Sequence, residues 1–260
     1  MIKILKYSIY DLMRSRWTYA YFGFFLLFTL SLLVLSNDLS RVIISMMNVV
    51  LILCPLIATM FGIMYYYNSR EFTELLLAQP IKRISIFWGQ YLGLASSLSV
   101  SLLLGIGLPF VTYGLFFSSE IWNFMVLLLN GVALSFIFSG IAFFIALKNE
   151  NKIRGFGLAI LCWLFFAVIY DGIFLVLLMI FREYPLEQFS LIATVLNPID
   201  LSRILLLLKL DISALMGFTG AVFKQFLGTG SGILVAGLVL TFWVGLPLLG
   251  IRRVALRKDF

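Results

Sequence analysis

Residues 121–147 read IWNFMVLLLNGVALSFIFSGIAFFIAL, a stretch without a single charged residue. A helix rises about 1.5 Å per residue, so about 20 such residues cross the roughly 30 Å hydrocarbon core of a bilayer. Apolar runs of this kind occur six times, at 19–36, 42–67, 84–117, 121–147, 155–181 and 233–251. We therefore expect an all-α integral membrane protein with six transmembrane helices.

The composition agrees with a membrane protein and not with a soluble domain. The 260 residues are 62% hydrophobic and only 12% charged, whereas soluble domains carry about 25% charged residues. The runs are apolar on every side, while membrane barrel strands alternate over about 10 residues, so the spans are predicted to be helices. We expect one transmembrane domain over 1–260. The net charge of +7 comes from residues beside the spans and does not indicate nucleic-acid binding.

The basic residues are divided unevenly between the two sides of this domain. With the amino terminus inside, fourteen of the nineteen Lys and Arg residues lie on the inner side and five on the outer side. The inner residues are Lys3, Lys6, Arg14, Arg16, Arg70, Lys82, Arg83, Lys148, Lys152, Arg154, Arg252, Arg253, Arg257 and Lys258. The outer residues are Arg41, Arg182, Arg203, Lys209 and Lys224. Cytoplasmic loops carry the excess of Lys and Arg, so both termini are predicted to be cytoplasmic.

The amino-terminal segment 1–18 has apolar residues at helical spacing, with charges between them. These residues are Ile2, Leu5, Ile9, Leu12 and Met13. This pattern favours a short helix in the inner membrane interface, with Trp17 and Tyr19 at headgroup depth. A basic anchor without a further role is the alternative.

The segment 182–231 is the longest part outside the predicted spans, and it lies on the outer side. Within it, 201–210 reads LSRILLLLKL, whose uninterrupted apolar core is too short to cross a bilayer. Counting it as a span would also move the basic carboxyl terminus outside. We expect an outer interfacial or re-entrant helix there.

Several kinds of chemistry have no residues to support them. The chain contains no His and no Gly-x-x-x-x-Gly-Lys-Ser/Thr motif, so it does not bind ATP through a P-loop. We find no His/Cys/Asp cluster at metal-ligand spacing and no set of nucleophile and base. Met60 and Met64, four residues apart, could form a soft metal site, although such a pair is more often ordinary packing. We therefore expect no catalytic residue, metal or cofactor in this chain, and we do not expect an enzyme.

The inner segment 68–83 reads NSREFTELLLAQPIKR. Its residues 74–79 favour a helix, which Pro80 ends. The result is a short amphipathic helix between two spans. Phe72, Leu75 and Leu76 could fill a groove on a cytoplasmic partner, or the segment could be a surface loop without a partner.

This segment resembles the coupling-helix region of ABC-2-type transporter permeases, which typically show Glu-Arg-Glu-x-Gly-Thr, a Leu-rich turn, Pro-Val-x-Arg and then Gly-Lys. The matching positions are Arg70, Glu71, Thr73, Leu75, Leu76, Leu77, Pro80, Arg83 and Gly89. The chain departs at Ser69, which replaces the first Glu, at the missing Gly before Thr73, and at Gln90, which replaces the Lys. Residues 11–17, DLMRSRW, are similar to the interfacial elbow helix of that family.

The resemblance implies a type V exporter-like architecture and a partner chain for ATP hydrolysis. It implies an amino-terminal elbow helix over 1–18, a cytoplasmic coupling helix over 68–83, a homodimer in the bacterial inner membrane, and a cytoplasmic ABC ATPase that holds the ATP and Mg. The residues expected to couple to the ATPase are Arg70, Glu71, Phe72, Thr73, Glu74, Leu75, Leu76, Pro80, Arg83, Lys152 and Arg154.

Residues 196–203 and 214–223, together with Tyr170 and Asp171, resemble a narrower group within that family. These are the permeases that serve maturation of the copper site of nitrous oxide reductase. The resemblance implies a periplasmic protein docked on 183–230. The residues expected to bind it are Asn197, Pro198, Asp200, Arg203, Gly217, Thr219 and Gly220.

Asp171 lies inside an apolar run, about 11 residues or about 16 Å from its outer end. A charged carboxylate at that depth costs at least about 2.5 kcal/mol, so it needs a partner, a cavity, a dimer interface or a proton. Conceivable partners are Asn48, Thr59, Asn130 and Tyr170. Asp171 and Tyr170 are candidates for an intramembrane switch, and an interhelical hydrogen bond with only a structural role is the alternative.

Three functions are compatible with these patterns. The first is a mechanical coupler that transmits ATP-driven motion to a periplasmic partner; the lack of His, and of Cys outside the spans, argues against a copper-conducting path. The second is an exporter of a small solute through the dimer interface. The third is a membrane scaffold that anchors partners without transport.

Overall fold

The computed structural model describes residues 1–36, 38–181, 186–210 and 230–257, and these are helical with short connections. Five long helices, and a sixth assembled from three segments, match the six predicted apolar runs, so the six-span prediction is confirmed. The long helices are α2 (Arg16–Leu35), α3 (Leu39–Asn68), α5 (Arg83–Thr112), α6 (Ile121–Lys148) and α12 (Gly230–Arg257). The assembled span consists of α7 (Lys152–Leu164), η2 (Phe165–Ile169) and α8 (Tyr170–Ile180).

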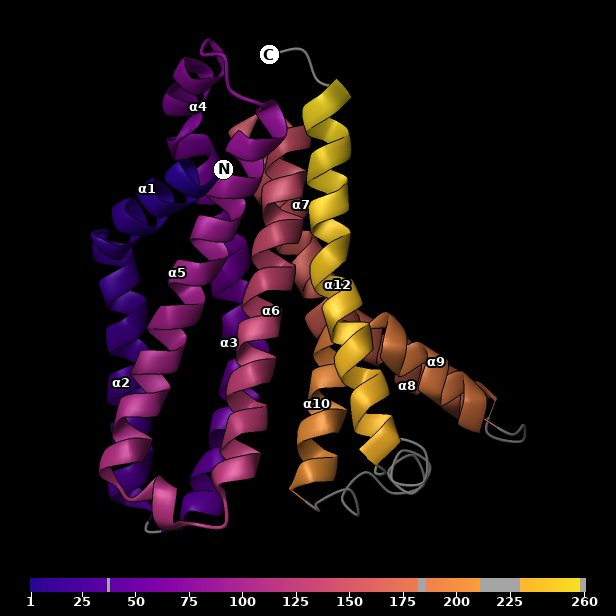
Figure 1. The fold of residues 1–260 in the computed structure, drawn as a ribbon. Helices are drawn as coiled ribbons and strands as arrows, with labels where there is room; N and C mark the ends of the chain where they lie inside the picture. Colours follow the sequence, from indigo (N-terminus) through magenta and orange to yellow (C-terminus); the bar gives the residue numbers. More distant parts are fainter. Residues whose placement is uncertain (37, 182–185, 211–229, 258–260) are drawn as a thin grey trace.

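The remaining elements are short. They are α1 (Ile2–Met13), α4 (Arg70–Leu77), the 3-10 turn η1 (Leu115–Phe117), α9 (Glu187–Leu196) and α10 (Pro198–Lys209). Figure 1 shows the amino terminus, α4 and the last turn of α12 at one end of the bundle. An even number of crossings requires this arrangement. We call this end the α4 end; it is the end that the charge distribution predicts to be cytoplasmic.

Small residues allow the central helices to approach closely. A Cβ atom at Gly62 of α3 would lie 2.8 Å from the Ala142 Cβ of α6, closer than side chains pack. Membrane helices gain stability from such backbone proximity because lipid supplies no hydrophobic drive between them. Large buried side chains, among them Ile63 of α3 and Phe143 of α6, fill the core beside this contact.

Helix α1 crosses α5 at two glycines. A Cβ atom at Gly93 would lie 2.5 Å from the Ser8 Cβ, and one at Gly89 would lie 2.9 Å from Cγ2 of Ile4. The buried face of α1 is therefore Ile4, Ser8 and Leu12. Of the five apolar residues that the sequence pattern placed at helical spacing, only Leu12 is buried. The buried face instead includes Ser8, which packs against Gly93 where a larger side chain would not fit.

The helices α9 and α10 meet at Asn197, where the chain direction turns by 116°. A turn beyond 90° sends α10 back to the side from which α9 came, which favours the re-entrant alternative for 201–210. Helix α10 lies beside α6 and α12 (Figure 1). Its Ile199, Leu201 and Leu206 are buried in the main core.

Candidate functional site

Helix α4 is held to the bundle by one polar and one aromatic contact. The Gln90 Nε2 of α5 donates a 2.8 Å hydrogen bond to Oγ1 of Thr73, which is itself buried. The Thr73 hydroxyl donates to the Ser69 carbonyl at 2.8 Å. The Phe72 ring stacks on Tyr7 of α1, with centroids 4.9 Å apart. One face of α4 is thereby fixed to α1 and α5 together.

The opposite face of α4 is open. Leu75 is 68% exposed, and Glu71, four positions earlier, is exposed as well. Nε of Arg70 donates to Oε1 of Glu74 at 2.9 Å, and this hydrogen bond raises the pKa of the Arg70 guanidinium above its ordinary value, so it stays charged. An apolar side chain flanked by fixed charges is what a docking surface for a soluble partner offers.

A second exposed apolar side chain lies at the start of α7. Ile153 is 84% exposed between Lys152 and Arg154, which are exposed as well. The Asn151 side chain caps the helix by accepting from the backbone N–H groups of Ile153 and Arg154, at 2.9 and 3.2 Å. This cap fixes the three exposed residues on the first turn.

The end of α3 contacts the turn before α7. The Tyr67 hydroxyl donates to the Asn149 carbonyl at 2.7 Å and lies 3.2 Å from the Asn151 carbonyl. The Tyr67 ring also occupies the space above Gly155, where a Cβ atom would collide with its hydroxyl. The helix that precedes α4 is thus joined to the first turn of α7.

These contacts place the predicted coupling residues at the α4 end, with different surroundings. Phe72 and Thr73 face the bundle, whereas Glu71, Glu74, Leu75 and Pro80 are exposed. Leu76 is half-buried, and Arg83 begins α5. The sequence analysis noted Gln90 only as a departure from the family pattern and missed its contact with α4. The signal was a long amide side chain that can hydrogen-bond to a Thr in a short neighbouring helix.

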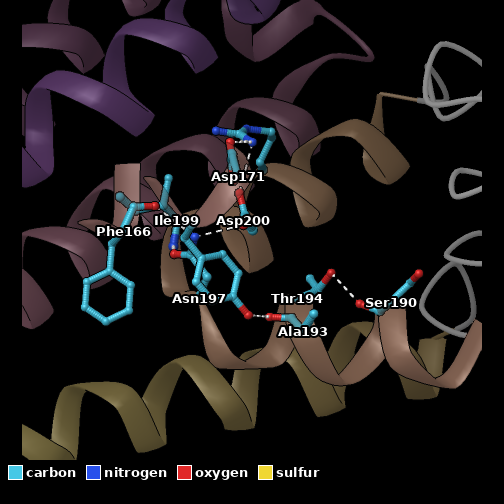
Figure 2. Close-up of polar contacts among 10 residues, drawn as sticks. Phe166, Asp171, Ser190, Ala193, Thr194, Asn197, Ile199 and Asp200 are labelled. Carbon is cyan, nitrogen blue, oxygen red and sulfur yellow. Dashed lines mark hydrogen bonds and ion pairs between the residues drawn. The ribbon is translucent and has the colours of Figure 1, made fainter. Parts of the chain in front are cut away.

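A second polar site lies within the fifth span. The five residues of η2 form a π-helix, in which the Tyr170 N–H bonds to the Phe165 carbonyl five residues back. Such a bulge disturbs the regular ladder and is frequent at functional sites. The Phe166 carbonyl accepts a 2.9 Å hydrogen bond from Nδ2 of Asn197, at the apex between α9 and α10 (Figure 2).

Asn197 organises the start of α10. Its Oδ1 accepts from the Ile199 N–H at 3.0 Å as the helix cap, and its Nδ2 also donates to Oδ2 of Asp200 at 2.8 Å. Pro198 follows at the first helical position, where a missing N–H carries no penalty. The Asn-Pro pair of the sequence therefore marks a helix start in the interior of the protein.

One guanidinium bridges two carboxylates at this apex. NH1 of Arg203 donates to Oδ2 of Asp171 at 2.7 Å and to Oδ1 of Asp200 at 2.9 Å. The side chains of Arg203 and Asp171 are 31% and 29% exposed, and that of Asp200 is 11% exposed. We call Asp171, Asp200 and Arg203 the charged triad. It joins α8 to α10.

Further bonds attach α9 to the same region. The Tyr170 hydroxyl donates to the Ala193 carbonyl at 2.6 Å (Figure 2), and Nε1 of Trp243 in α12 donates to the Val195 carbonyl at 3.1 Å. The charged triad borders a cavity of about 240 Å³. Its other walls are Tyr170, Phe174, Leu175, Leu178, Ala193, Thr194 and Ile204.

The partners of Asp171 differ from those considered from the sequence. Thr59 and Asn130 bond to carbonyls of their own helices, Pro55 and Val126, and Tyr170 bonds to Ala193. The partner is Arg203, which the sequence pattern had assigned to the outer surface. The spacing of three residues between Asp200 and Arg203 on a helix indicated their mutual ion pair, but not the pair of Arg203 with Asp171.

Four of the seven predicted partner-binding residues lie in the described part of the chain. Asn197, Pro198 and Asp200 are buried and Arg203 is half-buried, with their polar groups bonded inside the chain. Gly217, Thr219 and Gly220 lie outside the described residues. The binding of a periplasmic partner by these seven residues stays a prediction.

The described residues form an all-helical, multi-pass membrane protein with six candidate spans and a short docked helix between the second and third. No family model matches the sequence. The chain is similar to the "Probable ABC transporter permease protein NosY" of Stutzerimonas stutzeri, with 23% identity over 273 aligned residues that cover 95% of this chain and 94% of the relative. This full-length match supports an ABC transporter permease subunit, a class that typically lacks ATPase activity of its own.

Proposed function

We propose that this chain is the permease subunit of a complex similar to NosDFY, in the bacterial inner membrane with both termini in the cytoplasm. A NosF-like ATPase binds at the α4 end of a permease homodimer and holds the ATP and Mg. A NosD-like protein binds on the periplasmic side. The complex supports copper-site maturation of nitrous oxide reductase by transmitting motion, and no reaction is catalysed by the permease itself.

The attachment of α4 is the observation that carries this proposal. A loose surface loop would not transmit force, whereas α4 is fixed on one face by Gln90 and Tyr7 and open on the other at Leu75. A partner that moves Leu75 therefore moves α1 and α5 with it. The exposed Ile153 of α7 gives the same partner a second contact on the neighbouring span.

Motion at α7 has a continuous route to the outer half of the molecule. The span 152–180 runs through the π-helix to Asp171, and the charged triad connects Asp171 to α10. Ion pairs with two alternative carboxylates can exchange partners, so Asp171 and Tyr170 are proposed as an intramembrane switch. The re-entrant α9 and α10 then carry the motion to the periplasmic partner.

An exporter is the second candidate, and one observation favours it. The cavity of about 240 Å³ beside the charged triad combines polar groups with the apolar Phe174, Leu175 and Leu178. Such a lining suits a small solute with one polar end. A scaffold without transport, the third possibility, does not require α4 to be fixed to the bundle.

Affinity purification of the tagged chain from its native membrane, followed by mass spectrometry, tests the proposal. We expect an ABC ATPase and a NosD-like periplasmic protein to be recovered together. Recovery of the ATPase alone would favour the exporter, and recovery of neither would reject coupling. Glu71→Gln with Glu74→Gln should lower ATP-dependent activity of the recovered complex without dissolving it; unchanged activity would favour the scaffold.

A further inference from the structure

A second, larger cavity lies between α1 and the α4 end of α3. Its volume is about 520 Å³. It is lined by Tyr7, Tyr10, Asp11, Leu12, Arg14, Ser15, Trp17, Phe61, Met64, Tyr65 and Asn68. The proposed function uses none of these residues except Tyr7.

The lining combines one acid, one base and several aromatic rings. Asp11 and Arg14 are exposed, and within the described part of the chain neither forms an ion pair with another residue. Both charges therefore remain available to a ligand. The hydroxyl of Ser15, the residue before α2, makes no capping hydrogen bond.

The position of the cavity indicates the source of the ligand. It lies where α1 turns into the second helix, at the ends of the apolar spans α2 and α3. Trp and Tyr side chains gather at this level because their rings are apolar and their tips are polar. Lipid headgroups occupy the same level of the bilayer, so a lipid headgroup can reach this cavity.

The charges select the kind of headgroup. We propose that this cavity binds the zwitterionic headgroup of phosphatidylethanolamine. The Arg14 guanidinium and the Ser15 hydroxyl bind the phosphate. The Asp11 carboxylate and the Tyr7 and Tyr10 rings bind the ammonium. An anionic lipid without an ammonium group leaves Asp11 unpaired against a negative headgroup.

The site is joined to the coupling helix. Tyr7, one wall of the cavity, is the residue on which Phe72 of α4 stacks, at 4.9 Å between ring centroids. A headgroup that orders Tyr7 also orders the surface against which α4 rests. Bound lipid therefore stabilises the attachment of α4 to α1.

Native mass spectrometry of the full-length chain, released from vesicles of equal parts phosphatidylethanolamine and phosphatidylglycerol, tests this proposal. We expect retained phosphatidylethanolamine in excess by about tenfold. Asp11→Asn should abolish the preference between the two lipids, and Arg14→Gln should reduce retention of both. Arg16→Gln is the matched control, since Arg16 is an exposed arginine two positions along that does not line the cavity.

Equal retention of the two lipids by the unaltered chain would overturn the proposal, as would a loss with Arg16→Gln as large as that with Arg14→Gln. Soluble phosphoethanolamine carries the same charged groups as the lipid headgroup but has no acyl chains. It therefore tests whether the cavity binds a membrane lipid or a free metabolite. We expect phosphatidylethanolamine vesicles, and not phosphoethanolamine at equal concentration, to raise the unfolding temperature of the detergent-purified chain. The reverse result would contradict a membrane lipid as the ligand.

Discussion

At the scale of single residues, the charged triad has one more acid than base. Asp171 alone at its depth would be expensive, and so would Arg203 alone. Together with Asp200 they satisfy one another, because the guanidinium donates to both carboxylates at once. The arrangement stabilises the joint between α8 and α10 without fixing a single pairing.

This asymmetry predicts unequal effects of two substitutions. Asp171→Leu leaves the Arg203–Asp200 pair intact and should lower the free energy of unfolding by about 1 kcal/mol. Arg203→Leu leaves two adjacent carboxylates without a cation and should cost about 3 kcal/mol. Thermal unfolding of the two purified variants in the same detergent measures which variant loses more stability.

The same Asp171→Leu variant also separates a switch from a structural residue. As a switch, it should assemble with its partners normally and fail in ATP-driven turnover. Normal turnover would leave Asp171 with a structural role only. A larger loss of stability for Asp171→Leu than for Arg203→Leu would contradict the triad as the source of both effects.

The sequence showed that Asp171 needs a partner but not which one. Its charge and depth follow from the apolar run around it, whereas Arg203 lies 32 positions away, in a segment whose depth depends on the 116° turn at Asn197. Such a turn is set by tertiary packing of α10 against α6 and α12, and no local pattern encodes it.

At the scale of elements, α4 has two faces with different tasks. The face with Phe72 and Thr73 is attached to the bundle, and the face with Leu75 is open. The sequence grouped Phe72, Leu75 and Leu76 as one docking set because all are apolar at helical spacing. It could not divide them, since the ring partner of Phe72 is Tyr7, which is far from it in the sequence.

A charge on the open face of α4 should release the ATPase. Leu75→Asp places a carboxylate in the predicted apolar contact, where an unpaired buried charge costs about 3 kcal/mol or more. We expect at least a tenfold loss of ATPase recovered by pull-down, whereas Leu75→Ala should lose less. Since Leu75 is 68% exposed, the permease alone should keep its unfolding temperature.

An intact complex with full ATPase stimulation in the Leu75→Asp variant would show that docking occurs elsewhere. Ile153→Asp on α7 is then the next candidate, because Ile153 is another strongly exposed apolar residue at the α4 end. Loss of folding in the Leu75→Asp permease without its partner would instead place Leu75 in the bundle.

The length and apolarity of the runs made the spans predictable, whereas the π-helix could not be predicted from the sequence. Each run of about 20 apolar residues has one low-energy solution in lipid, a helix. A π-bulge differs from that helix by one hydrogen-bond register. The Phe166 carbonyl within it accepts a hydrogen bond from the side chain of Asn197, which lies 31 positions further along the chain. The sequence of 165–169, FFAVI, contains no residue that marks the change.

At the scale of the whole molecule, coupling to a cytoplasmic ATPase depends on the orientation of the bundle in the membrane. The α4 end must face the cytoplasm for an ATPase to reach Leu75 and Ile153, and the charged triad must open toward the other side. The excess of Lys and Arg beside one end of the spans predicts this orientation, and the structure places α4 and the amino terminus at that same end (Figure 1).

Cysteine labelling in intact cells checks the orientation. The two native cysteines, Cys54 and Cys162, are replaced by Ala, and Ile153→Cys or Trp122→Cys is introduced. The side chains of Ile153 and Trp122 are 84% and 71% exposed, and the two residues lie at opposite ends of the bundle. A membrane-impermeant maleimide should label the Trp122→Cys variant in intact cells and the Ile153→Cys variant only after the membrane is opened. The opposite pattern would put α4 outside, where no ATP is available, and would remove the basis for coupling to a cytoplasmic ATPase.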